Sequence, residues 1–169
     1  MTPVFAVALV GLTVIALYAI FGGADFGGGV WDMLATGPRR RLQRAAITNA
    51  IGPVWEANHV WLIFAIVLLF TCFPRAFADI ATGLYAPLSF ALIGIVLRGA
   101  AFVFRNHVEI PAVRQTWTVV FGAASVIGPF FLGDAAGAIA TGRYDWTSPF
   151  ALSIGVFAVV LCASVLRLS

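Results

Sequence analysis

The stretch VFAVALVGLTVIALYAIFGGADFGGGVWD, residues 4–32, decides the fold class of this chain. It begins with about 20 predominantly apolar residues, the length that an α-helix needs to cross the hydrocarbon core of a bilayer. The apolar run ends in five glycines grouped around one acidic residue, Asp25. An ionisable side chain at the end of a membrane span is costly and usually has a functional or structural reason.

The composition of the whole chain is typical of a membrane protein. Of its 169 residues, 62% are hydrophobic and only 10% are charged. Soluble domains are about half apolar and about a quarter charged. The basic side chains are ten arginines against seven acids, for a net charge of +3. In a polytopic membrane protein this balance reflects arginine-rich cytoplasmic loops, so nucleic acid is not an expected partner.

Four further apolar segments follow the first one. We predict an all-α, polytopic transmembrane bundle that forms one domain over residues 1–169. Its five spans are expected at residues 4–23, 53–73, 78–104, 117–140 and 149–166. Each span must be helical, because backbone groups in lipid need hydrogen-bond partners within their own segment. We interpret the first run as a mature span, since it lacks the basic start of a signal peptide.

The placement of the arginines predicts the orientation. The connection at residues 35–52 carries four arginines and the one at residues 105–116 carries two, whereas the other two connections carry one each. Cytoplasmic loops are enriched in arginine, so we expect the N-terminus outside and the C-terminus in the cytoplasm. Residues 39–50 leave two interpretations open, namely a short amphipathic helix on the inner leaflet or a charged loop that sets the topology.

Three ionisable residues within or at the ends of the predicted spans are candidates for a shared site: Asp25, Glu56 and Arg98. The predicted topology places all three towards the cytoplasmic face. Two carboxylates and one guanidinium can satisfy each other away from water. A buried carboxyl can also take up and release protons, as a proton entry path requires. The residues alone therefore leave open a proton path and an ion-pair cluster that fixes helix packing.

Neighbouring polar and small residues limit the kinds of site that this part of the chain can form. The spacing of Glu56 and His59 occurs in di-iron bundles, but a di-iron site needs a second such pair, which the sequence lacks. We therefore expect no metal site and interpret His59 as a polar residue that faces the bundle. The glycine-rich stretch lacks the GK[ST] ending of a phosphate loop. Gly23 and Gly27 are instead spaced to let two helices approach closely.

Three segments resemble subunit II of the cytochrome bd-type quinol oxidases. The first is FGGADFGGGVWDML, and the second is AIGPVWEANHVWLI. The third, FALIGIVLRGAAFVFR, looks like the third helix of that family, with Arg98 at the family's arginine. The matching positions of the first two segments are Asp25, Gly27, Gly29, Pro53, Trp55, Glu56, Asn58, Val60, Trp61 and Leu62.

The resemblance implies a subunit of a quinol:oxygen oxidoreductase, an enzyme complex of aerobic respiration that reduces oxygen to water. Subunit I of such a complex carries the haems b and d and the quinol site, so this chain would bind no haem and hold no catalytic residue. It would stabilise subunit I and offer a cytoplasmic proton path through Asp25 and Glu56. The supporting polar partners would be Arg98, Asn58 and His59. The helix-packing residues would be Gly23, Gly27, Gly29, Trp55 and Trp61.

The resemblance covers one four-helix repeat and the helix that follows it, whereas typical members have two repeats. We expect the first four spans to form a four-helix bundle with the fifth at its flank. The expected location is a bacterial or archaeal plasma (inner) membrane. Expected partners are subunit I and membrane lipids, and a separate chain that supplies the second half stays open. Some family members also bind a structural quinone. Two alternatives remain: a purely structural scaffold subunit and an independent small transporter.

Overall fold

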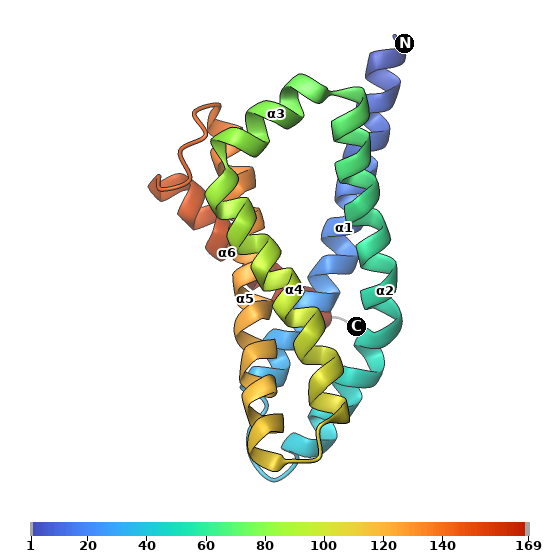
Figure 1. Cartoon of the computed structure of the whole chain (residues 1–169), viewed down its shortest axis with the longest axis vertical. Helices are drawn as coiled ribbons and strands as arrows, with labels where there is room; N and C mark the ends of the chain where they lie inside the picture. Colours follow the sequence, from blue (N-terminus) through green and yellow to red (C-terminus); the bar gives the residue numbers. More distant parts are fainter. Residues whose placement is uncertain (1, 168–169) are drawn as a thin grey trace.

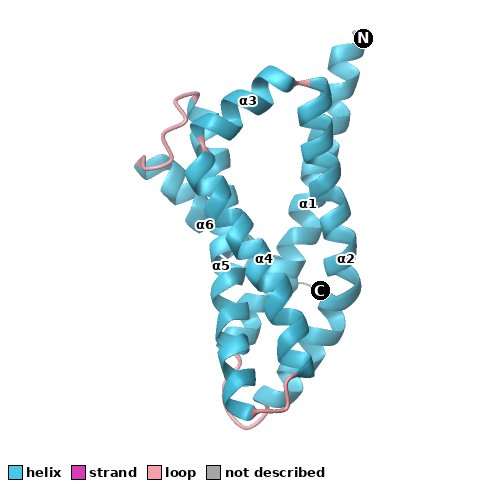
Figure 2. Ribbon diagram, viewed as in Figure 1, coloured by secondary structure: helices cyan, strands magenta, loops and turns pink. Residues whose placement is uncertain are grey.

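A computed structural model describes the backbone of residues 2–167 and most of their side chains. The side chains outside the described part are those of Arg41, Ile51, Pro53, Val54, Glu56, Leu166 and Arg167. The described backbone contains six α-helices and no strand, which confirms the all-α fold class (Figure 2). In chain order the helices are α1 (Pro3–Leu34), α2 (Arg40–Cys72), α3 (Pro74–Gly83), α4 (Tyr85–His107), α5 (Pro111–Thr141) and α6 (Pro149–Arg167).

The helices form a polytopic bundle. Within the described residues, α1, α4 and α5 are each long and apolar enough to cross a membrane. The second half of α2 and the short helix α3 make a fourth candidate, which bends by 116° where the two helices meet. The described part of α6, Pro149–Val165, is apolar but shorter. These elements occupy the five regions in which the sequence predicted spans.

The structure differs from the predicted boundaries at two places. Residues 78–83 belong to α3, and only α4 forms the third span. The break falls at Phe73, whose backbone is not helical (φ −132°, ψ 56°), because a residue that precedes a proline is disfavoured in the helical region. The other difference lies at residues 40–50, which form the first turns of α2 instead of a separate surface helix or a loop.

The glycine-rich stretch at residues 21–32 is helical throughout, because α1 runs unbroken to Leu34. Each glycine weakens an isolated helix by about 1 kcal/mol relative to alanine. Here the missing side chains allow close packing. A Cβ atom on Gly27 would collide with the backbone of Cys162 in α6, and one on Gly29 would collide with Ser125 in α5. The glycines therefore bring α1 against two other helices.

Helix α5 holds the centre of the bundle, since it packs against α1, α4 and α6. At its crossing with α4, a Cβ atom on Gly94 would lie 2.8 Å from the backbone nitrogen of Gly128. Helix α6 packs against both α1 and α5, and α2 packs along α1. Figure 1 shows the connections at residues 35–39 and 108–110 at one end of the molecule, with α3 and residues 142–148 at the other. The two arginine-rich connections thus lie at one end of the molecule and the other two at the opposite end, as the sequence predicted.

We expect Gly27→Ala to lower the free energy of unfolding by about 1–3 kcal/mol, the usual cost of overpacking. The added methyl group would meet the backbone of Cys162, which cannot move away without separating α6 from α1. Thermal or denaturant unfolding in detergent micelles measures the loss. Gly52→Ala in α2 is the matched control, because its Cβ atom meets no described atom within 4 Å. Equal stability of the two variants would contradict this packing.

Candidate functional site

A buried ion pair joins α1 and α4 near the glycine-rich stretch. Nη2 of Arg98 lies 2.8 Å from Oδ1 of Asp25 and also donates a hydrogen bond of 2.6 Å to the backbone carbonyl of Asp25. Each of the two residues is only 1% exposed. Charge-assisted hydrogen bonds of this kind are strong, and a buried charge needs them to offset its lost hydration.

Arg98 reaches α1 across the surface of α5. Its Nε donates a hydrogen bond of 3.0 Å to Oγ of Ser125, and that hydroxyl donates in turn to the carbonyl of Phe121 at 2.7 Å. The guanidinium lies over two rings, 5.2 Å from the centroid of Phe26 and 4.8 Å from that of Phe121. The guanidinium is therefore held by a carboxylate, a hydroxyl and two aromatic faces, which fixes its position.

A second buried ion pair lies two helical turns further along the same helices. Nη1 of Arg105 is 3.1 Å from Oδ1 of Asp32, and its Nη2 donates a 3.0 Å hydrogen bond to Oγ1 of Thr48 on α2. Nε of Arg44, also on α2, lies 3.7 Å from the other carboxylate oxygen and donates to the backbone carbonyl of Asp32. Asp32 is fully buried and so contacts two arginines from two helices.

The two ion pairs share one aromatic ring. The guanidinium of Arg105 lies 3.9 Å from the ring centroid of Phe121, the same ring that Arg98 faces. Sequence reasoning missed this second pair, because it assigned Arg105 to a loop and gave Asp32 no role. A signal was available in the spacing: the two aspartates and the two arginines are each seven residues apart, which places each pair of like residues on one helix face.

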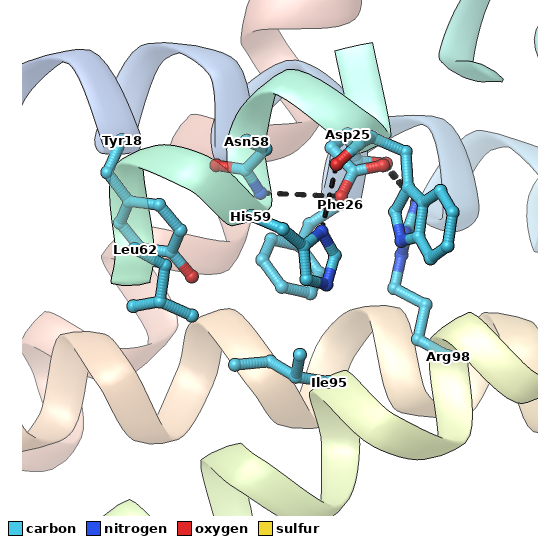
Figure 3. A pocket seen from close by; sticks show the side chains of 9 residues that line it. Tyr18, Asp25, Phe26, Asn58, His59, Leu62, Ile95 and Arg98 are labelled. Carbon is cyan, nitrogen blue, oxygen red and sulfur yellow. Dashed lines mark hydrogen bonds and ion pairs between the residues drawn. The ribbon is translucent and has the colours of Figure 1, made fainter. Parts of the chain in front are cut away.

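A small pocket lies beside Asp25 between α1, α2 and α4 (Figure 3). The space open to the centre of a water molecule is about 10 Å³, enough for about one water. Asn58 and Arg98 point at Asp25 from opposite sides, and Nδ2 of Asn58 donates a long hydrogen bond of 3.5 Å to Oδ2 of Asp25. His59 borders the pocket, and its Nδ1 donates to the carbonyl of Trp55 at 2.8 Å. The complete lining is Tyr18, Asp25, Phe26, Trp55, Asn58, His59, Leu62, Ile95 and Arg98.

The structure brings together four of the predicted polar residues: Asp25, Asn58, His59 and Arg98. The side chain of Glu56, the second predicted acid, lies outside the described part of the chain, although its backbone belongs to α2. The structure therefore does not test whether the two acids meet.

The predicted packing residues lie on the inner helix faces or beside them. Gly23 faces Val165 of α6, and Trp55 lies against Gly99 and Phe102 of α4. Trp61 is half-buried on α2. Within the residues that the structure describes, no group of three or more His, Cys, Asp or Glu side chains is arranged to hold a metal ion.

The fold and the site define a class of protein: a polytopic helical membrane protein with two buried aspartate–arginine pairs between its helices. Comparison with known proteins gives the family. Residues 2–165 match the family model of cytochrome bd terminal oxidase subunit II, and the chain belongs to that family. The resemblance predicted from three sequence segments is thereby confirmed.

Relatives in two organisms illustrate the match. The chain is 36% identical over 111 residues to cytochrome bd ubiquinol oxidase subunit 2 of Bacillus subtilis, covering 66% of this chain and 32% of that protein. It is 30% identical over 134 residues to cytochrome bd-I ubiquinol oxidase subunit 2 of Escherichia coli K12, covering 79% of this chain and 35% of that protein. The matches thus span about a third of the length of these curated relatives.

We expect Arg98→Leu to destabilise the protein by about 3–5 kcal/mol, because it leaves the carboxylate of Asp25 buried without its cation. The double variant Asp25→Asn/Arg98→Leu should regain most of this loss, since it removes both charges. Denaturant unfolding in detergent micelles measures the coupling between the two sites. Arg143→Leu, in an exposed connection, is the matched control and should change stability little. If the double variant loses as much stability as the two single variants together, the two residues do not interact.

Proposed function

We propose that this chain acts as subunit II of a cytochrome bd-type quinol:oxygen oxidoreductase. The observation that carries the proposal is the family match over residues 2–165, together with relatives that are themselves named as subunit 2 of ubiquinol oxidases. In this function the chain binds no haem. The haems b and d belong to subunit I, and the chain takes part in oxygen reduction only within the complex.

The proposed role of the chain in the reaction is to admit protons from the cytoplasmic side. Asp25 suits this role because it contacts one arginine and one amide and borders a pocket of about the size of a water molecule. Asp32 suits a structural role instead, because two arginines from two helices contact its carboxylate. Glu56 is proposed as the second acid of the path on the ground of its position in the AIGPVWEANHVWLI segment.

The second proposed role is to stabilise subunit I in the membrane. Large apolar side chains are exposed along α2 and α4, for example Val60 and Ile63 on one helix and Leu92 and Val96 on the other, each 60–65% exposed. Such faces are stable only against lipid or against another membrane chain. We propose that lipids and subunit I cover them.

The proposed location is a bacterial or archaeal plasma membrane, with the N-terminus outside and the C-terminus in the cytoplasm. The distribution of arginines supports this orientation. The arginine-rich connection that leads into α2 and the connection between α4 and α5 lie at the same end of the molecule (Figure 1). The two buried ion pairs lie in the half of the bundle nearer to that end.

In the assembled oxidase, we expect Asp25→Asn and Glu56→Gln to slow quinol-driven oxygen consumption by roughly tenfold or more, because each removes a group that exchanges protons. The haem content of the complex should stay unchanged. Oxygen uptake per haem measures the effect. Asp79→Asn, an exposed acid on α3 at the opposite end of the molecule, is the matched control. If the two variants lose haem but turn over normally per haem, the chain is a structural scaffold and not a proton path.

Affinity purification of the tagged chain from its own membranes should yield a haem-bearing partner, because the exposed apolar faces of α2 and α4 are proposed to contact subunit I. A visible spectrum of the eluate, recorded oxidised and reduced, detects the haems. The same tag on an unrelated polytopic protein from those membranes is the control and should elute without haem. If this chain also elutes without haem from membranes that contain the oxidase, the subunit assignment is wrong and an independent transporter takes its place.

A further inference from the structure

An arginine-rich surface lies at the end of the molecule where α1 passes into α2 (Figure 1). Residues 33–55 contain four arginines and no acidic residue. The arginines are Arg39, Arg40, Arg41 and Arg44. The side chains of Arg39 and Arg40 are exposed, and that of Arg44 is 29% exposed. This surface therefore carries a positive charge that no acidic side chain of the same segment neutralises.

One of these arginines is held in a fixed position by the end of α1. Nε of Arg44 donates a hydrogen bond of 3.2 Å to the backbone carbonyl of Asp32 and lies 3.7 Å from Oδ2 of Asp32. An arginine has five N–H donors, and the contacts of Arg44 within the described part of the chain use only the one on Nε. Its two Nη groups are therefore left to bind an anion, in the bidentate way in which guanidinium groups bind phosphate.

A second arginine lies beside Arg44 on α2. Arg40 precedes Arg44 by four residues, which places the two side chains on one face of the helix with Cβ atoms about 5–6 Å apart. Like charges at this spacing repel each other and destabilise the helix. The carboxylate of Asp32 is already shared between Arg44 and Arg105. A phosphate that contacts both Arg40 and Arg44 removes their repulsion, so the pair favours an anionic ligand.

Apolar side chains beside the arginines favour a lipid over a soluble anion. Leu34 lies two residues after Asp32 and is 56% exposed, and Met33 is 45% exposed. Cations next to exposed apolar side chains at the end of a membrane span fit the phosphate and the acyl chains of a phospholipid. The positive charge of the surface favours a phospholipid with a net negative charge over a zwitterionic one.

We propose that Arg40 and Arg44 bind the headgroup phosphate of an anionic phospholipid, and that Leu34 packs against its acyl chains. Arg39 adds to the positive charge of the site. The bound lipid connects the start of α2 to the end of α1, where Arg44 contacts Asp32. The leaflet alone rests on the function proposed above, because the proposed orientation places this end of the molecule, and so the lipid, on the cytoplasmic side.

The experiment follows thermal unfolding of the full chain in detergent micelles while phosphatidylglycerol is added. This anionic lipid should raise the unfolding midpoint more than phosphatidylcholine with the same acyl chains, and added salt should reduce the difference. Arg40→Gln should raise the phosphatidylglycerol concentration needed for half of the effect about fivefold, the usual contribution of one arginine near an anionic lipid surface. The side chain of Arg40 is exposed, so this variant should fold like the unmodified chain. Arg75→Gln, at an exposed arginine on α3 at the opposite end, is the matched control.

Three results would overturn the lipid site. The first is equal stabilisation by the two lipids, and the second is unchanged phosphatidylglycerol binding in Arg40→Gln. The third is a full effect of glycerol phosphate, which has the phosphate but no acyl chains and would make the ligand a soluble anion. Loss of the haem-bearing partner in Arg40→Gln, with lipid binding unchanged, would assign this surface to a protein partner instead.

The proposed orientation is tested separately, because the titration in micelles does not depend on it. Thr36→Cys, in a Cys72→Ser background, places a thiol in the connection that precedes α2. A membrane-impermeant maleimide should label it in inside-out vesicles and not in intact cells. Labelling in intact cells would reverse the orientation and leave the lipid site in place, in the other leaflet. Normal turnover in Asp25→Asn would overturn the proton path and also leave the lipid site in place.

Discussion

The rest of the structure depends on the ion pair between Asp25 and Arg98. Two charges that are each 1% exposed are stable only if they contact each other and if their remaining hydrogen-bonding groups find partners. This requirement brings α1, α4 and α5 close together, because Arg98 reaches Asp25 across Ser125. A side chain on Gly29 would occupy the position of the Ser125 hydroxyl. The glycines of α1 are thus a condition for the ion pair as well as for helix packing.

The second ion pair joins three helices. Asp32 and Arg105 connect α1 to α4, and through Thr48 and Arg44 they also connect α2. The ring of Phe121 packs against the guanidinium groups of both Arg98 and Arg105. The pair of Asp32 and Arg105 thus lies among polar partners from three helices, whereas the pair of Asp25 and Arg98 lies beside the small pocket.

Much of this arrangement could be predicted from the sequence, because composition and arginine placement fix the spans and their order. Asp25 and Arg98 were expected to approach each other since both lie near the same predicted face. The second span was predicted to end at residue 73, where α2 is followed by Phe73 and α3, but hydropathy did not show that residues 78–83 belong to a separate short helix. Asp134 received no role, yet it is fully buried in α5. Hydropathy marks where a span can lie, but not where its helix ends or which side chains face inward.

Polar side chains recur at a regular spacing along α1. Tyr18, Asp25 and Asp32 occupy one face at intervals of seven residues, whereas Gly27 contacts α6 and Gly29 contacts α5. The glycines of α1 bring its backbone close to α5 and α6, and Phe26 and Met33 fill the space against Gly128 and Gly122 of α5. Its polar line must then be satisfied by α2 and α4, which supply Asn58 and Arg98. The same glycines that let the helices pack therefore determine that the polar face of α1 is turned into the bundle.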